Sequence, residues 1–172
     1  MITNITLIGM PGAGKSTVGI ILAKRLSMEF IDTDVLIQAR QHRTLQEILD
    51  REGHLRLREI EQQEILRLAV DRHVIATGGS AVYSAAAMRH LRERSWIVFL
   101  RVSLAVIQRR VHDFGNRGLA RPPQQSLPDL FAERQALYQT YAQFTIDVDA
   151  LDQDQVSEAV AVQWSARPGP AL

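Results

Sequence analysis

A glycine-rich segment near the N-terminus constrains this chain more than any other feature of its sequence. Residues 9–16 read GMPGAGKS and match the pattern G-x-x-x-x-G-K-[ST] at every fixed position. An apolar run, Ile5 to Ile8, precedes the segment, and an amphipathic helical pattern follows it over residues 18–26. A strand, a glycine turn and a helix in this order predict a phosphate-binding loop. The alternative is a chance glycine-rich turn, which would not be expected to have both a strand before it and a helix after it.

The chemistry of such a loop predicts roles for its residues. The glycines let the backbone form a ring of N–H donors, and the helix N-terminus adds the positive end of its dipole. Lys15 is expected to reach the β- and γ-phosphates of ATP, and Ser16 is expected to supply a hydroxyl to Mg²⁺. The ATP-binding residues expected here are Gly12, Ala13, Gly14, Lys15, Ser16 and Thr17.

Apolar runs of strand length recur along the chain and lack an alternating pattern. This absence of alternation is typical of strands that are buried on both faces of a parallel sheet. Helical patterns lie between the runs, so the sequence predicts right-handed βαβ crossovers and an α/β three-layer fold. Capping-box spacings, Thr44 with Glu47 and Asp152 with Gln155, mark two helix starts. The expected strands lie at residues 5–8, 30–31, 74–76, 97–100 and 145–146.

Composition limits the class of protein. With 172 residues, 46% hydrophobic and 23% charged, the chain fits one soluble domain, expected over residues 1–166 with a disordered tail at 167–172. A net charge of +1 gives no sign of nucleic-acid or membrane binding, and no cysteine is present. The chain shows neither a signal peptide nor an apolar run near the roughly 18 residues of a membrane span. We expect a cytoplasmic monomer.

Two carboxylates follow the second apolar run, in the sequence Asp32-Thr33-Asp34. Alone, such a pair is as typical of a strand-end cap or a solvated turn as of a binding site. After a P-loop helix, however, the end of the next parallel strand borders the phosphate site. We therefore expect Asp32 to hold Mg²⁺ and Asp34 to orient or deprotonate the hydroxyl that accepts the phosphoryl group.

Several further segments, in their order along the chain, make the sequence resemble the shikimate kinase family of the nucleoside-monophosphate-kinase-like P-loop group. The resemblance covers roughly residues 5–149. It implies a sheet of about five parallel strands, an acceptor region at about 35–61 and a mobile lid at about 112–128. The implied reaction is Mg²⁺- and ATP-dependent phosphorylation of the 3-hydroxyl of shikimate. The matching segments are the P-loop, residues 32–34, residues 53–61, Thr77-Gly78-Gly79, Arg121-Pro122, Glu133-Arg134 and Leu137-Tyr138.

The same resemblance implies an acceptor site. Arginines suit a carboxylate substrate, because a guanidinium pairs with it bidentately. Arg51 and Arg56 lie near Arg58, and a solvated helix arginine is the alternative, so only the motif register selects Arg58. Glu61 lies three residues further along the helix and is expected to hold Arg58 in its working rotamer. The implied acceptor-binding residues are Asp34, Arg58, Gly78, Gly79 and Arg134.

Two arginines are implied on the nucleotide side. Arg110 resembles the adenine-side arginine, although Arg109 beside it leaves the register open. Arg121 resembles the lid arginine that meets charge on the transferring phosphoryl group, and Arg117 is the alternative. With Lys15 and Asp34, Arg121 completes the expected catalytic set.

One departure from the family pattern falls on the acceptor side. Ser80 stands where the family has a third glycine, so we expect either a negative φ or stored strain, and a side chain that crowds the acceptor or binds it. His54 and Pro123 also depart from the pattern. Two alternatives therefore remain open: a kinase of the same fold for another small hydroxy-acid or polyol, and a nucleotide-binding regulatory protein with little catalysis.

Overall fold

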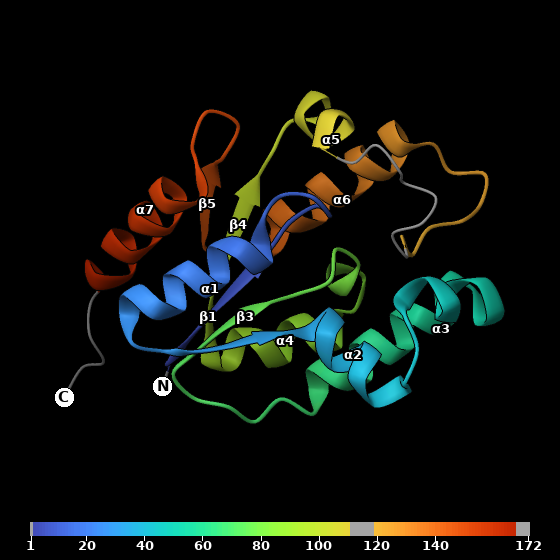
Figure 1. The fold of residues 1–172 in the computed structure, drawn as a ribbon, viewed down its shortest axis with the longest axis horizontal. Helices are drawn as coiled ribbons and strands as arrows, with labels where there is room; N and C mark the ends of the chain where they lie inside the picture. The colour runs from blue at the N-terminus through green and yellow to red at the C-terminus, as the bar shows by residue number, and fades with distance from the viewer. Residues whose placement is uncertain (1, 111–118, 168–172) are drawn as a thin grey trace.

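A computed structural model describes residues 2–110 and 119–167 of the chain (Figure 1). Its centre is a sheet of five parallel strands in the order β2-β3-β1-β4-β5, which confirms the predicted fold class and strand number. Each of the five expected apolar runs forms one strand. The strands are β1 (Asn4–Ile8), β2 (Glu29–Asp32), β3 (His73–Ala76), β4 (Ser95–Arg101) and β5 (Phe144–Asp147).

The helices lie on both faces of the sheet. Helices α1 and α7 pack against each other on one face, and α4 and α6 cover the other (Figure 1). Between the layers, the central strands β1 and β4 are almost entirely buried, as their continuous apolar sequences require. The helices are α1 (Lys15–Leu26), α2 (Thr33–Gln41), α3 (Leu45–Leu66), the short 3₁₀ helix η1 (Ala81–Tyr83), α4 (Ala85–Arg94), α5 (Leu104–Arg110), α6 (Leu127–Tyr141) and α7 (Gln153–Ser165).

Strand register brings the polar motifs to one edge of the sheet. Ala76 of β3 pairs with Leu7 of β1 on one side and with Asp32 of β2 on the other. The P-loop, the carboxylate pair and the turn after β3 therefore all leave the sheet at its carboxyl edge. Parallel α/β folds bind ligands at this edge, between strands whose connections leave in opposite directions.

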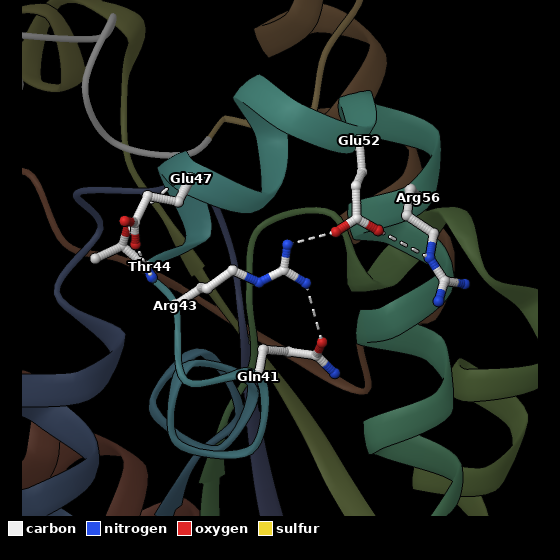
Figure 2. Close-up of polar contacts among 6 residues, drawn as sticks. All are labelled: Gln41, Arg43, Thr44, Glu47, Glu52 and Arg56. Carbon is white, nitrogen blue, oxygen red and sulfur yellow. Dashed lines mark hydrogen bonds and ion pairs between the residues drawn. The ribbon is translucent and has the colours of Figure 1, made fainter.

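Helix α3 carries much of the expected acceptor region and is not continuous. Both predicted capping boxes are present, and the one at Thr44 and Glu47 starts α3. Gly53 has φ 81° and interrupts the helical backbone, so α3 consists of two segments. The Glu52 carboxylate joins them, because it pairs with Arg56 beyond the kink at 3.4 Å and with Arg43 before the helix at 2.6 Å (Figure 2).

The structure describes parts of the expected acceptor region, lid and tail. The acceptor region forms α2 and α3, and α3 continues past Glu61 to Leu66. Residues 112–118 of the expected lid lie outside the described residues, whereas its last residues, 127–128, begin α6. In the expected tail, residues 168–172 also lie outside the described residues, but the guanidinium of Arg167 contacts the rings of Trp96 and Trp164. Across residues 2–110 and 119–167, no helix has the length and apolarity needed to cross a membrane.

Candidate active site

The P-loop, residues 9–16, connects β1 to α1 through glycines with positive φ. Gly12 has φ 85°, and Gly14, which is the N-cap of α1, has φ 91°. Residues with side chains rarely adopt these backbone angles, so glycine is required at both positions. The turn leaves the first N–H groups of α1 available to an anion, and the positive end of the helix dipole lies at the same place.

Lys15 is buried beneath this loop, with 8% of its surface exposed. Its Nζ donates to the carbonyl oxygens of Gly9 at 2.8 Å and Met10 at 2.9 Å. Burial lowers the pKa of Lys15 to about 8, against the opposing effect of the Asp34 and Asp32 carboxylates. Because both partners of the amine are neutral carbonyls, charged phosphate oxygens would be stronger partners for it.

Asp32 caps helix α2 with one carboxylate oxygen and contacts the P-loop with the other. Its Oδ1 accepts from the backbone N–H groups of Asp34 at 2.9 Å and Val35 at 3.4 Å, which makes Asp32 the N-cap of α2. Its Oδ2 accepts from the hydroxyl of Ser16 at 2.5 Å. The cap therefore fixes one carboxylate oxygen and leaves the other beside the P-loop.

The Ser16–Asp32 pair fits a magnesium ion in its chemistry. A hydroxyl and a carboxylate oxygen are hard oxygen ligands, which Mg²⁺ prefers, and it usually takes the rest of its octahedron from water and phosphates. Among the residues that the structure describes, no cluster of three or more His, Cys, Asp or Glu side chains forms a complete metal site. These two side chains would thus be partial ligands.

Two neighbouring cavities lie at this carboxyl edge. The larger, of about 550 Å³, lies over the P-loop and extends to Gln38 and Thr44 at the acceptor region. The smaller, of about 50 Å³, lies between the turn after β3 and the helices α2, α3 and α6. Pro11 and Asp34 line both. Asp34 therefore marks the junction between the phosphate-binding side and the acceptor side.

The surroundings of Asp34 raise the pKa of its carboxyl group. Burial raises the pKa of Asp34 to about 6, and the negative charge of Asp32 adds to this rise. Lys15 and Arg134 oppose it by favouring the charged form. A carboxyl group with a pKa in this range is largely ionised at neutral pH and is a better base than an ordinary aspartate.

The two predicted acceptor arginines meet at one backbone oxygen. Arg58 donates from Nη2 to the carbonyl of Ala120 at 3.0 Å, and Arg134 donates from Nη2 to the same oxygen at 3.1 Å. Arg134 is 1% exposed. The guanidinium of Arg58 lies 3.5 Å from the ring centroid of Tyr83. Within the described chain, the Nε atoms of both arginines are buried without a hydrogen-bond partner.

Gly78 and Gly79 form the floor of this acceptor side. A β-carbon on Gly78 would collide with the carboxylates of Glu61 and Asp34. A β-carbon on Gly79 would lie 2.7 Å from Pro11 Cδ and 2.8 Å from Arg134 Nη1. Larger residues would therefore fill the space in which these charged side chains converge.

The two nucleotide-side arginines lie in different places. Arg110 donates to the carbonyl of Gly12 at 3.4 Å, so it is next to the P-loop. Arg121 instead donates to the carbonyl of Gln125 and lines a separate cavity of about 270 Å³ beside Gly53 and His54. The structure does not bring Arg121 together with the P-loop, and the alternative, Arg117, lies outside the described residues.

Two expectations about Glu61 and Ser80 are resolved. Glu61 does not hold Arg58: in the described part of the chain no hydrogen bond or ion pair joins them, and Glu61 accepts from the Ser80 hydroxyl instead. Ser80 has φ −97°, so it carries no left-handed strain.

Sequence reasoning missed Tyr83, whose ring contacts the guanidinium of Arg58. A single aromatic residue after a glycine turn gives no signal for this role.

Fold and site together define a P-loop phosphotransferase, with a nucleotide loop and a pocket of opposite charges on either side of Asp34. The family model described as shikimate kinase matches residues 11–164. Shikimate kinases of Paracidovorax citrulli and Thermodesulfovibrio yellowstonii are 40% and 35% identical to this chain. These alignments cover 83% and 94% of the chain and 81% and 94% of the relatives. The chain belongs to the shikimate kinase family, whose members are phosphotransferases with an alcohol acceptor.

A solved structure agrees over nearly the whole chain. The shikimate kinase from Acinetobacter baumannii in complex with shikimate has a TM-score of 0.89 and 30% sequence identity. The match covers 98% of this chain and 97% of the other. The likeness therefore includes the acceptor region as well as the nucleotide-binding core.

Proposed function

We propose that this protein transfers the γ-phosphoryl group of ATP to the 3-hydroxyl of shikimate and forms shikimate 3-phosphate and ADP. The observation that carries the proposal is the position of Asp34, between the phosphate-binding cavity and a pocket with two convergent arginines. A hydroxy-acid whose carboxylate lies at the arginines would present its opposite edge to Asp34. The complex of the Acinetobacter relative with shikimate supports this acceptor.

The nucleotide is held by the P-loop. Backbone N–H groups between Gly12 and Thr17 bind the phosphates, and Lys15 exchanges its carbonyl partners for the β- and γ-phosphate oxygens. Arg110, next to Gly12, flanks the nucleotide on its adenine side. Backbone donors and the Lys15 cation thereby offset part of the charge of the triphosphate.

Ser16 and Asp32 would hold Mg²⁺ through their hydroxyl and carboxylate oxygens. When bound, the metal would supply positive charge that neutralises the phosphates. In this role Asp32 keeps its cap on α2, because the two functions use different carboxylate oxygens. Loss of metal binding is therefore separable from loss of the helix cap.

The acceptor is oriented by charges on its two edges. Arg58 and Arg134 donate to its carboxylate, and Gly78 and Gly79 let the ring approach the backbone. Asp34 accepts a hydrogen bond from the reacting hydroxyl and takes its proton as the new O–P bond forms and the bond to ADP breaks. For Arg121 to stabilise the charge on the transferring group, its guanidinium must leave the Gln125 carbonyl.

Release of ADP measured with and without shikimate, and with a panel of related hydroxy-acids and polyols, tests the proposal. We expect ADP release that depends on shikimate and exceeds that with any other acceptor. A higher rate with another acceptor would assign the same site to that compound. Nucleotide binding with no acceptor-dependent turnover would favour a regulatory role.

A further inference from the structure

The turn after β3 places a serine hydroxyl against α3 inside the acceptor pocket. Ser80 donates from Oγ to Oε2 of Glu61, and the two residues are 7% and 3% exposed. Four residues later, Ser84 makes a comparable contact with α3, from its Oγ to Oε1 of Gln62 at 2.5 Å. Ser84 does not line the acceptor cavity, whereas Ser80 does. The chain thus contains a matched pair of serine contacts, one inside the pocket and one outside.

Glu61 and Asp34 converge at the floor of this pocket. A β-carbon on Gly78 would collide with Oε1 of Glu61 and would lie 2.6 Å from Oδ1 of Asp34. Both residues line the smaller cavity, so each presents one oxygen to the same space. Two neighbouring acceptors of hydrogen bonds match two neighbouring donors on a ligand, such as the hydroxyls of a vicinal diol.

The helix alone would favour a different partner for Glu61. Arg58 lies one turn away at i, i−3, a spacing at which opposite charges usually pair. Instead, the guanidinium of Arg58 stacks on Tyr83 and donates to Ala120. Glu61 accepts a hydrogen bond from the Ser80 hydroxyl in place of one from Arg58.

The buried position of Glu61 disfavours the ionised form of its carboxyl group. Burial raises the pKa of Glu61 to about 7, and the neighbouring Asp34 carboxylate adds to the rise, whereas the hydrogen bond from Ser80 lowers it. The Ser80 hydroxyl therefore helps to keep Glu61 ionised at neutral pH. The titratable and charged groups that face Glu61 are Lys15 from α1, Asp34 from α2, Arg58 from its own helix, and Arg134 and Tyr138 from α6.

We propose that Ser80 is a positioning residue of the acceptor site: its hydroxyl holds Glu61 beside Asp34, so that Glu61 binds the hydroxyl next to the one that reacts. This inference rests on the proposed function and deepens it, because it assigns a positioning residue to the acceptor site. Asp34 takes the reacting hydroxyl and Glu61 its neighbour.

A double-mutant cycle tests the coupling. Ser80→Ala should raise the KM for shikimate by about tenfold and leave the KM for ATP unchanged, because one hydrogen bond to a buried charge is lost. In a Glu61→Gln background the same change should have an effect of less than about twofold. The matched control, Ser84→Ala, should leave both KM values unchanged. An equal effect of Ser80→Ala in both backgrounds, or no effect beyond that of Ser84→Ala, would overturn the proposal.

A titration that needs no activity gives the second readout. The carboxyl ¹³C signal of Glu61, assigned by its loss in Glu61→Gln, should titrate about one pH unit higher in Ser80→Ala than in wild type. Ser80→Gly should give the same shift and serves if the alanine variant does not fold, since either residue adopts φ −97°. An unchanged titration contradicts the positioning role, whereas a wild-type protein that shows no shikimate-dependent turnover contradicts the proposed function instead.

Discussion

Arg58 and Arg134 donate to the same backbone oxygen, that of Ala120, at 3.0 and 3.1 Å. Two guanidinium groups this close repel each other, and burial together with the charge of Arg134 lowers the pKa of Arg58. A single neutral carbonyl compensates only part of this charge. A ligand carboxylate placed between the two arginines would relieve the repulsion and accept hydrogen bonds from their guanidinium groups.

This geometry predicts that Arg58→Lys and Arg134→Lys weaken acceptor binding far more than nucleotide binding. Lysine keeps the charge but loses the planar fork, so each change should cost on the order of 2 kcal/mol, or roughly 30-fold in affinity. Calorimetric titration of shikimate and of an ATP analogue, each alone, measures the two effects. Arg56→Lys, two residues away and paired with Glu59 on the exposed face of α3, is the matched control. Equal losses for both ligands would indicate a structural role.

Removal of the P-loop amine should abolish turnover without unfolding the protein. We expect Lys15→Met to reduce kcat by more than about 100-fold, because the positive charge of Nζ at the transferring phosphoryl group is lost. Methionine has a similar volume, so the core around α1 should keep its packing. Circular dichroism checks that the variant is folded, and a steady-state assay measures the loss of kcat. Near-wild-type activity in the variant would refute the role of Lys15.

Asp32→Asn should separate the metal ligand from the helix cap. Asparagine caps helices about as well as aspartate, so α2 should remain stable. It lacks the negative charge, so the Mg²⁺ concentration needed for half-maximal activity should rise by about tenfold or more. Asp152→Asn, at the N-cap of α7, tests for general effects of the same exchange. An unchanged magnesium requirement in Asp32→Asn would show that Asp32 is only a cap.

Asp34 should impose a pH dependence on both activity and stability. Its folded pKa of about 6 predicts that kcat/KM for shikimate falls about tenfold per unit below pH 6, as the base becomes protonated. The folded pKa lies above the ordinary value of 3.8, so the native state binds this proton more tightly than the unfolded state. Ionised Asp34 therefore reduces the free energy of unfolding as pH rises from about 4 to 6, by on the order of 3 kcal/mol in total.

Asp34→Asn removes this penalty. The variant should lose turnover, yet its Tm should exceed that of wild type at pH 7, and the difference should nearly disappear near pH 3, below both pKa values, where the wild-type carboxyl is mostly protonated in both states. Differential scanning calorimetry at the two pH values measures it, with Asp50→Asn on the exposed surface of α3 as the control. A lower Tm for Asp34→Asn at pH 7 would show that its ionised form stabilises the fold.

The fold was predictable because its signals are local. Each buried strand is a short apolar run, and the P-loop and both capping boxes are fixed by residues within a few positions of one another. The partner of Glu61 was not predictable in this way. Helical spacing favours Arg58, but tertiary packing brings the turn after β3, with Ser80, closer to the carboxylate. The meeting of Arg58 and Arg134 at Ala120 likewise joins residues 62 and 14 positions from that carbonyl.

The product of the reaction tests the central claim most directly. Phosphorus NMR of a mixture of the protein, ATP, Mg²⁺ and shikimate should show one new phosphate monoester for each ADP formed, with coupling to the proton at carbon 3 of the ring. Without shikimate, the γ-phosphate signal should persist. Release of inorganic phosphate in place of the monoester, or a monoester on another hydroxyl, would contradict the account.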